Sequence, residues 1–215
     1  MMAAFESFAR RVLNRGAVPV ARALSAIGIP ANVITIVGFL GNVAAAVLIF
    51  QGKLVYGGIA MLIAGLFDVL DGAVARASNK TDQSGALLDS VVDRYSEAII
   101  FFALWAYFFV NSQFVAASFT FLSIIGSLLV SYIRARAEGL DIECRVGLMQ
   151  RGERIGLLSI GLMLSKVQFA SFQSPNWAGS PLLIIVLGAL AVLSNLTALR
   201  RLIFSYSELH RVGRG

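Results

Sequence analysis

The stretch from Asp68 to Asp93, DVLDGAVARASNKTDQSGALLDSVVD, decides how the rest of the chain is interpreted. It holds two pairs of carboxylates, Asp68 with Asp71 and Asp89 with Asp93, spaced three and four residues apart. Spacings of three and four place the members of each pair on one face of a helix. Because acidic side chains at bilayer depth are costly, a cluster of four in an apolar chain indicates a functional site.

The composition of the chain predicts an all-α polytopic membrane protein. Of its 215 residues 58% are apolar and 14% are charged, against roughly 25% charged in soluble domains. A soluble fold of this size could not bury so much apolar surface. The net charge of +6 favours cytoplasmic loops that face anionic lipid, and we expect no nucleic-acid partner.

Two residue types are nearly absent, which limits the chemistry of any metal site. Cys144 is the only cysteine and His210 is the only histidine. An internal disulfide, a zinc site and a catalytic histidine are therefore not expected. A metal ion would need oxygen ligands, which are typical of Mg²⁺, Mn²⁺ and Ca²⁺.

Apolar segments long enough to cross a bilayer recur six times along the chain. We predict one domain over residues 1–215, in which residues 1–27 form an amphipathic helix at the membrane interface, residues 32–204 a bundle of six transmembrane helices, and residues 205–215 a cytoplasmic tail. The six predicted spans are Val33–Phe50, Leu54–Ala75, Gly85–Val110, Phe114–Ile133, Ile155–Phe172 and Pro181–Phe204.

The distribution of basic residues sets the orientation of these spans. With the N-terminus inside, the outer connections contain Lys53 and Lys166 and no acidic residue, whereas nearly all other Lys and Arg residues are on the inner side. This asymmetry follows the positive-inside rule. It predicts a multi-pass protein of the cell (inner) membrane with its four carboxylates at the cytoplasmic side.

Four converging carboxylates are suited to binding two divalent cations. Two such ions would cancel the four negative charges, and paired metals in an oxygen cage clamp phosphoryl oxygens during a displacement. Small residues at Gly72, Ala75 and Gly85 leave room for a ligand to approach the backbone, and Arg76 provides a fixed cation for phosphate. The stretch therefore predicts a site for a diphosphate, two metal ions and a planar base.

Other interpretations of the carboxylates remain open. Single Asp residues serve as helix caps or halves of ion pairs, and Arg94 lies next to Asp93. A membrane prenyltransferase also uses Asp-rich motifs, metal and diphosphate, and a cation transporter binds ions through intramembrane carboxylates.

The spacing Asp-x2-Asp-Gly-x2-Ala-Arg-x8-Gly-x3-Asp-x3-Asp resembles the signature of the CDP-alcohol phosphotransferases, and every fixed position is filled. The resemblance implies attack by an alcohol hydroxyl on CDP-diacylglycerol, with release of CMP. It also implies roles for individual residues. Asp68, Asp71, Asp89 and Asp93 would bind two Mg²⁺ or Mn²⁺ ions, Asp93 would also be the general base, and Gly72, Ala75, Arg76 and Gly85 would line the CDP site.

The segments Tyr132–Glu138 and Arg151–Arg154 resemble the branch of this family that makes phosphatidylinositol phosphate. That resemblance implies a cationic pocket for the phosphate of inositol 1-phosphate, with glycerol 3-phosphate, the substrate of a phosphatidylglycerol phosphate synthase, as the alternative acceptor. Arg134 stands where a lysine is expected in the actinobacterial enzymes. Family members tend to be homodimers, so we expect the same here. The residues implied in acceptor binding are Asn32, Arg134, Arg151, Arg154 and Arg201.

Overall fold

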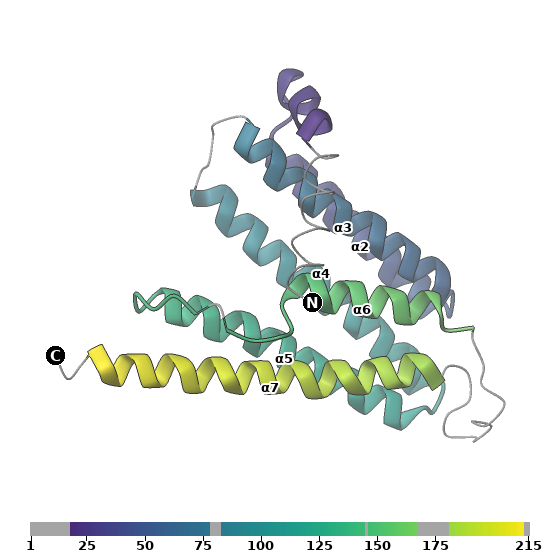
Figure 1. Ribbon diagram of the computed structural model, residues 1–215. Coiled ribbons are helices and arrows are strands. Elements are labelled where there is room, and N and C mark those ends of the chain that lie inside the picture. Colours follow the sequence, from purple (N-terminus) through teal and green to yellow (C-terminus); the bar gives the residue numbers. More distant parts are fainter. Residues whose placement is uncertain (1–17, 78–82, 145, 167–180, 213–215) are drawn as a thin grey trace.

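The structure, a computed structural model, describes residues 18–77, 83–144, 146–166 and 181–212. These residues are organised as helices and connecting turns, with a helical segment at residues 18–26 preceding six longer helices (Figure 1). The six are α2 (Ala31–Phe50), α3 (Leu54–Ala77), α4 (Gln83–Val110), α5 (Phe114–Glu138), α6 (Arg151–Met163) and α7 (Pro181–Val212). The predicted all-α class is therefore observed in the described residues.

Four of these helices, α2, α3, α5 and α7, are long and apolar enough to cross a membrane. α4 has 28 residues, but Asp93, Arg94 and Glu97 lie near its middle and interrupt the apolar run. α6 has only 13 residues. The third and fifth predicted spans are thus not confirmed, and most of the predicted N-terminal amphipathic helix lies outside the described residues.

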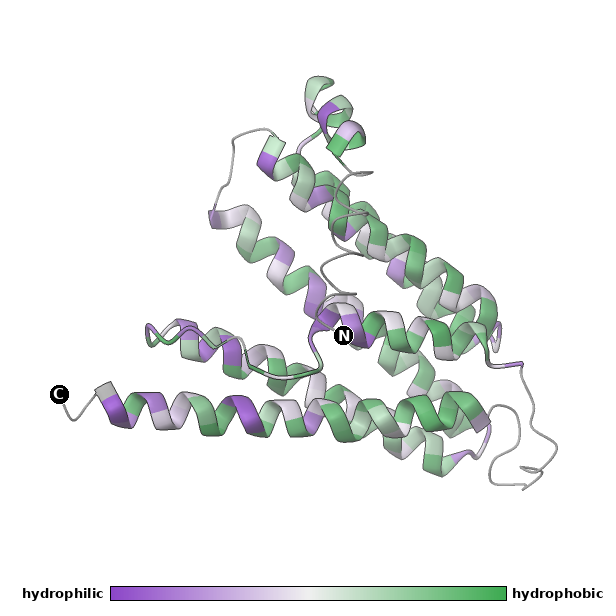
Figure 2. Cartoon of the chain, in the orientation of Figure 1, coloured by the Kyte–Doolittle hydropathy of each residue, from purple (hydrophilic) through white to green (hydrophobic). Residues whose placement is uncertain are grey.

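The helices form two closely packed pairs joined by the remaining two. α2 lies along α3, and α5 lies along α7, while α4 contacts α2 and α5, and α6 contacts α3 and α7. Figure 1 shows the two pairs diverging, with α4 and α6 between them. Polar residues concentrate on the middle of α4, the start of α6 and the second half of α7, as Figure 2 shows in purple.

The approach of α3 to α6 depends on Gly58. A Cβ atom at this position would lie 2.9 Å from Cβ of Leu162 and 3.0 Å from the carbonyl oxygen of Ser159. The first distance is shorter than real Cβ atoms show and the second is unusually tight, so a larger residue here would force the two helices apart. Small residues serve the same purpose at many interfaces between membrane helices.

Large apolar side chains are divided between a buried core and an outer surface. Ile49, Phe101 and Leu187 are buried in the main core, whereas Phe102 and Val110 are 62% and 73% exposed. Exposed apolar surface of this extent on long helices is suited to contact with lipid. This distribution supports the membrane class that the composition predicts.

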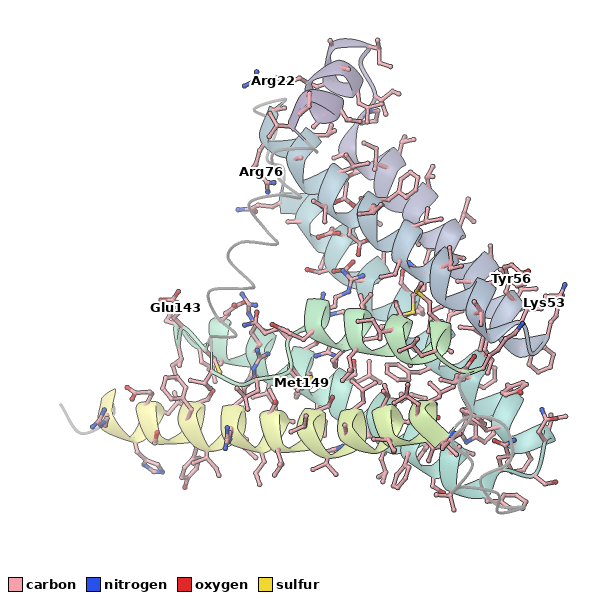
Figure 3. All side chains as sticks on the ribbon, turned by 45° about the vertical axis from the view of Figure 1, so that its right-hand side comes forward. Arg22, Lys53, Tyr56, Arg76, Glu143 and Met149 are labelled. Atoms are coloured by element: carbon pink, nitrogen blue, oxygen red, sulfur yellow. The ribbon has the colours of Figure 1, made fainter. Side chains whose placement is uncertain are left out.

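The charged ends of the α2–α3 pair are separated along its length. Figure 3 shows Arg22 and Arg76 at one end of this pair, and Lys53 and Tyr56 at the other end. The predicted topology requires this separation, since it assigns Lys53 to the outer side of the membrane and Arg76 to the inner side.

Candidate active site

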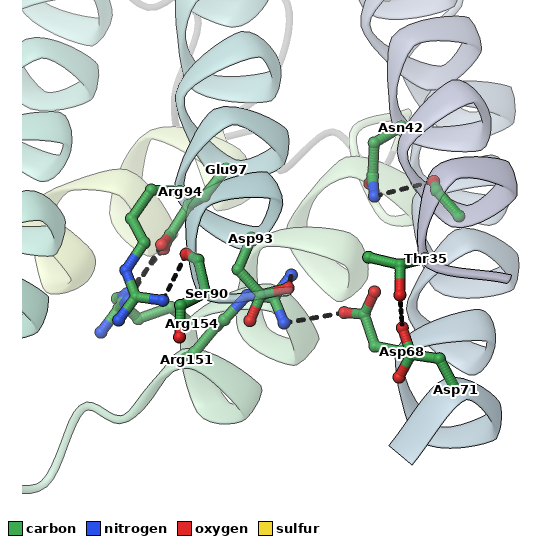
Figure 4. Close-up of polar contacts among 11 residues, drawn as sticks. Thr35, Asn42, Asp68, Asp71, Ser90, Asp93, Arg94, Glu97, Arg151 and Arg154 are labelled. Carbon is green, nitrogen blue, oxygen red and sulfur yellow. Dashed lines mark hydrogen bonds and ion pairs between the residues drawn. The ribbon is translucent and has the colours of Figure 1, made fainter. Parts of the chain in front are cut away.

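Asp68 and Asp71 lie on α3 and face neighbouring helices (Figure 4). Asp71 is 5% exposed, and its Oδ2 accepts a hydrogen bond of 2.7 Å from Oγ1 of Thr35 on α2. Thr35 is equally buried. A buried carboxylate that accepts a hydrogen bond from a neighbouring helix is fixed in orientation, so α2 helps to position this acidic residue.

Asp68 and Asp93 are joined by a single guanidinium group. Nη1 of Arg151 lies 2.8 Å from Oδ2 of Asp68, and Nη2 lies 2.8 Å from Oδ1 of Asp93 (Figure 4). Arg151 is the first residue of α6, so one side chain connects α6 with both α3 and α4. The carboxylates of the two halves of the sequence motif therefore face each other across a shared cation.

Asp89 belongs to the second half of the sequence motif. It is half-buried on α4 and lies four residues before Asp93, so the two carboxylates share one face of that helix. Its convergence with Asp68 and Asp71 stays a prediction.

The donor atoms of the cluster fit a hard divalent cation. They are all carboxylate oxygens, the ligands that Mg²⁺ and Mn²⁺ prefer, and one cation, the guanidinium of Arg151, already bridges two of them. As the side chains lie, no three Asp, Glu, His or Cys residues in the described part of the chain are close enough together to hold a metal ion. The four-ligand metal cage therefore stays a prediction.

Of the residues predicted to line a CDP site, Gly72, Ala75 and Arg76 lie near the end of α3, and Gly85 lies near the start of α4. A Cβ atom on Gly72 would lie 3.4 Å from Nη1 of Arg76, so the exposed Arg76 side chain folds back over this glycine. A Cβ atom on Gly85 would lie 3.2 Å from Oδ1 of Asn32. Asn32, expected to contact the acceptor, is thus next to a predicted CDP residue and does not line the arginine cavity described below. Ala75 is half-buried on α3.

A cavity of about 230 Å³ opens beside Asp93. Four of the five predicted acceptor residues line it, and they come from α5, α6 and α7. A fifth arginine, Arg94 of α4, adds to the wall. The lining residues are Asp93, Arg94, Glu97, Val130, Ser131, Arg134, Gln150, Arg151, Gly152, Arg154 and Arg201.

Arg154 is tied into a buried ion pair. Its Nε and Nη2 donate to the two carboxylate oxygens of Glu97 at 2.7 and 2.9 Å, and its Nη1 donates to the carbonyl oxygen of Met149 at 2.9 Å. The side chains of Arg154 and Glu97 are only 1% and 7% exposed. This fork-shaped contact holds α6 against α4.

Arg201 fixes the connection between α5 and α6 in a similar way. Its Nε donates to the carbonyl oxygen of Val146 at 2.8 Å, and its Nη1 donates to the carbonyl oxygen of Val130 at 2.8 Å. Arg201 is 3% exposed. Arg154 and Arg201 therefore each have protein partners on the cavity wall, and their predicted contacts with an acceptor stay predictions.

Arg134 and Arg151 are the more accessible arginines of the predicted set. Nε of Arg134 lies 2.8 Å from Oε1 of Glu138, and both side chains are about half exposed, at 46% and 50%. The Arg151 side chain is 25% exposed, but its Nε is buried and has no hydrogen-bond partner among the described residues. Each retains donor capacity for a ligand in the cavity.

Sequence reasoning missed Thr35 and Arg94. Thr35 belongs to α2, outside the carboxylate stretch, and a single threonine in an apolar helix carries no sequence signal of its own. Arg94 donates from Nη1 to the carbonyl oxygen of Ser90, one turn earlier. Arg94 follows Asp93 directly in the sequence, but this position was equally compatible with a simple ion pair between the two residues.

Comparison with known proteins gives consistent results. The sequence profile of the family described as CDP-alcohol phosphatidyltransferase matches residues 29–192. The archaetidylinositol phosphate synthase of Methanothermobacter thermautotrophicus is 35% identical over 200 residues, which cover 93% of this chain and 93% of that protein. The phosphatidylinositol phosphate synthase of Mycobacterium tuberculosis (strain H37Rv) is 33% identical over 196 residues, covering 90% of this chain and 87% of that protein.

Solved structures of the Mycobacterium tuberculosis synthase resemble the present fold. The structure with CDP-DAG bound matches with a TM-score of 0.78 and 32% identity, over 89% of this chain and 94% of that chain. The structure in complex with manganese and citrate matches with a TM-score of 0.77 and 32% identity, over 88% of each chain.

Proposed function

The chain belongs to the CDP-alcohol phosphatidyltransferase family and is an enzyme, and from that premise we propose that its acceptor is inositol 1-phosphate. In this proposal the phosphatidyl group of CDP-diacylglycerol is transferred to a hydroxyl of inositol 1-phosphate. The products are phosphatidylinositol phosphate and CMP. The reaction belongs to phospholipid biosynthesis.

The observation that carries this proposal is the arginine-lined cavity next to Asp93. Five arginines from four helices border a space of about 230 Å³. A phosphate dianion is matched by planar guanidinium groups, which bind its oxygens through paired hydrogen bonds. Inositol has no charge, and serine has a single carboxylate balanced by its ammonium group, so neither offers these cations the dianion that a phosphorylated acceptor provides. Relatives named for inositol phosphate products support the choice of this acceptor.

Asp93 is the proposed general base. It borders the arginine cavity and also contacts Arg151, so it lies at the boundary between the acceptor and the carboxylate cluster. Its carboxylate takes the proton of the acceptor hydroxyl as that oxygen attacks the phosphorus of the phosphatidyl group. A new oxygen–phosphorus bond forms, the bond to CMP breaks, and the proton remains on Asp93 until it is passed to water.

Asp68, Asp71, Asp89 and Asp93 are the proposed ligands of two Mg²⁺ or Mn²⁺ ions. When bound, these ions supply charge stabilisation for the diphosphate and for the CMP leaving group. The all-oxygen donor set and the manganese in the Mycobacterium tuberculosis structure support this assignment. Thr35 holds Asp71 in a fixed orientation through its hydrogen bond, which is the usual way that an outer partner improves a metal ligand.

The CDP-lipid is proposed to bind where α3 ends and α4 begins. Gly72, Ala75 and Gly85 leave the backbone accessible, and Arg76 provides a positive charge at the same end of α3. Asn32 lies beside Gly85 and so borders this donor site. The CDP-DAG in the Mycobacterium tuberculosis structure, which shares most of this fold, supports the choice of donor.

We also propose that the reaction occurs at the cytoplasmic face of the cell membrane, in a homodimer. The bias of basic residues toward one side of the predicted topology supports the orientation. Family resemblance alone supports the dimer.

A panel of acceptors tests the proposal. Purified protein is incubated with CDP-diacylglycerol and Mg²⁺ or Mn²⁺, together with inositol 1-phosphate, glycerol 3-phosphate, inositol or serine, and CMP and the lipid product are measured. A CDP-activated archaetidyl lipid is tested in parallel, because one relative is named for that lipid. We expect product with inositol 1-phosphate. Product with glycerol 3-phosphate alone would make the chain a phosphatidylglycerol phosphate synthase, and CMP release with no phosphorylated acceptor would refute the acceptor assignment.

A further inference from the structure

Arg151 contacts two groups that the proposed function assigns to different ligands. Its guanidinium bridges Asp68 and Asp93, which are proposed metal ligands, and its side chain also lines the cavity proposed for the acceptor phosphate. Figure 4 shows this side chain between the carboxylates of α3 and α4. One cation thus stands at the junction of the two halves of the site.

The ion pairs of Arg151 differ from the buried pair formed by Arg154, three residues later on the same helix. The side chains of Arg151, Asp68 and Asp93 are 25%, 21% and 16% exposed, against 1% and 7% for Arg154 and Glu97. Partly hydrated ion pairs exchange partners at low cost, whereas a buried pair cannot be separated without leaving an uncompensated charge. Arg151 can therefore leave its carboxylates while Arg154 keeps α6 in place.

The Arg151 guanidinium has a donor that the carboxylates do not use. Its Nε is buried and has no hydrogen-bond partner among the described residues. A buried donor without a partner raises the free energy of the folded protein. A ligand oxygen that accepts a hydrogen bond from this donor would therefore add directly to the binding free energy. The two Nη groups and Nε together form a fork that matches a phosphate.

We propose that Arg151 and a divalent cation compete for Asp68 and Asp93, and that the metal releases Arg151 to the acceptor phosphate. A carboxylate oxygen that ligates a metal ion attracts a guanidinium less strongly. The metal ion and the guanidinium also repel each other. Metal binding therefore frees the Arg151 fork, which remains on the cavity wall. Acceptor affinity then depends on the metal, so the metal binds before the acceptor. This inference rests on the proposed function, because it takes Asp68 and Asp93 as metal ligands.

Metal binding without turnover gives the first test. Mn²⁺ is titrated into the full-length purified protein, and free Mn²⁺ is followed by its electron paramagnetic resonance signal. Because the competing cation is removed, Arg151→Gln should bind Mn²⁺ about tenfold more tightly than the wild type, within the usual range of coupling between sites. Arg134→Gln is the matched control, since it removes a charge from the same cavity without touching Asp68 or Asp93. Equal Mn²⁺ affinity in the wild type and Arg151→Gln would overturn the proposal.

Phosphate binding gives the second test. Inositol 1-phosphate, and separately inorganic phosphate, is titrated calorimetrically with and without saturating Mn²⁺. In the wild type the affinity should rise about tenfold with Mn²⁺, and in Arg151→Gln this rise should vanish. A rise of the same size in Arg151→Gln would mean that the metal contacts phosphate without help from Arg151, which would also overturn the proposal. If Arg151→Gln does not fold, Arg151→Lys replaces it, because an ammonium group lacks the fork that bridges two carboxylates.

The two proposals fail separately in these experiments. CMP release is measured on the same preparations. Product formation from inositol 1-phosphate combined with unchanged Mn²⁺ affinity in Arg151→Gln would refute the exchange and leave the function standing. Tighter Mn²⁺ binding in Arg151→Gln without CMP release from any donor would leave the exchange standing and refute the function.

Discussion

Asp68, Asp71, Asp89 and Asp93 come from one helix–loop–helix segment, whereas the arginines around the cavity come from four helices between Arg94 and Arg201. The carboxylates have their spacing built into the sequence. The arginines meet only after α4, α5, α6 and α7 are packed together. The region proposed to carry the chemistry is therefore local in sequence, and the region proposed to select the acceptor depends on tertiary structure.

The comparison also separates two kinds of charged residue. On the carboxylate side, the side chains remain partly hydrated or are oriented by one neutral donor, Thr35. On the arginine side, Arg154 and Arg201 are buried and bonded to protein atoms. Two of the five cavity arginines are thus buried and hold protein contacts, whereas Arg134 and Arg151 are more exposed and remain accessible to a ligand. The following substitutions test this division, beginning with the largest expected effect.

Asp93→Asn should nearly abolish turnover. The amide cannot accept a proton from the acceptor hydroxyl, and loss of a general base costs about 10²- to 10⁴-fold in rate. Binding of the CDP-lipid should be partly retained, because Asp68, Asp71 and Asp89 remain. CMP release and CDP-lipid binding are measured on the same preparation. Asp141→Asn, in an exposed turn after α5, is the matched control and should keep the wild-type rate. A wild-type rate in Asp93→Asn would remove the assignment of the base.

Arg154→Ala should lower the free energy of unfolding by about 3–5 kcal/mol, because it leaves Glu97 as a buried charge without its partner. Arg134→Ala should change it by less than about 1 kcal/mol, since its ion pair with Glu138 is exposed to solvent. Denaturation of both variants in the same detergent gives the comparison. Similar losses for the two substitutions would show that the division between structural and ligand-binding arginines is wrong.

Thr35→Val should weaken Mn²⁺ binding about 10- to 100-fold, the usual effect of removing an outer partner of a metal ligand. The substitution keeps the side-chain shape and removes the hydroxyl, which donates to Asp71 at 2.7 Å and also lies 3.2 Å from the carbonyl oxygen of Ala31 in its own helix. Thr120→Val is the control, because Thr120 is as deeply buried but donates to the carbonyl oxygen of Ala116 in its own helix. Unchanged Mn²⁺ affinity in Thr35→Val would show that Asp71 is positioned without α2.

Arg134→Ala should raise the KM for the phosphorylated acceptor about tenfold, as expected for loss of one hydrogen bond to a charged group. The KM for the CDP-lipid should stay the same, because Arg134 lines the arginine cavity, whereas none of the residues predicted to line the CDP site does so. Arg136→Ala, on the same helix but outside the cavity wall, is the control. A change in the CDP-lipid KM of equal size would refute the separation of the two regions.

The sequence predicted the helices well where apolar runs have clear ends. The segments before Gln51 and after Asn111 were placed within a few residues of α2 and α5, because turn residues interrupt the apolar pattern there. α5 and α7 continue to Glu138 and Val212, beyond the predicted spans. Hydropathy marks where a segment leaves the apolar pattern, but the helical backbone continues wherever hydrogen bonding and packing allow it.

The parts of the candidate site that are close together in the sequence were easier to identify than the parts that only the fold brings together. The motif spacing singled out the four carboxylates, whose shared role stays a prediction, and family resemblance singled out four arginines that line one cavity. Neither the motif spacing nor the resemblance predicts that Arg154 pairs with Glu97 or that Arg151 bridges Asp68 and Asp93. These contacts join helices that are far apart in the sequence. The expected position of Asn32 differs for the same reason: its neighbour across the helices is Gly85, not the arginine cavity.

The tight contact of α3 with α6 at Gly58 is a point about which a tilt of α6 would displace the first residue of that helix. The contact is made through Ser159 and Leu162, and Arg151 lies eight residues before Ser159, about 12 Å along the helix axis. A tilt of α6 by about 5° around this contact would move the guanidinium of Arg151 by about 1 Å. Displacements of that size cost about 10²-fold in rate when they disturb reacting groups. The close packing that Gly58 permits deep in the bundle thus fixes the position of the helix from which Arg151 reaches the cavity wall.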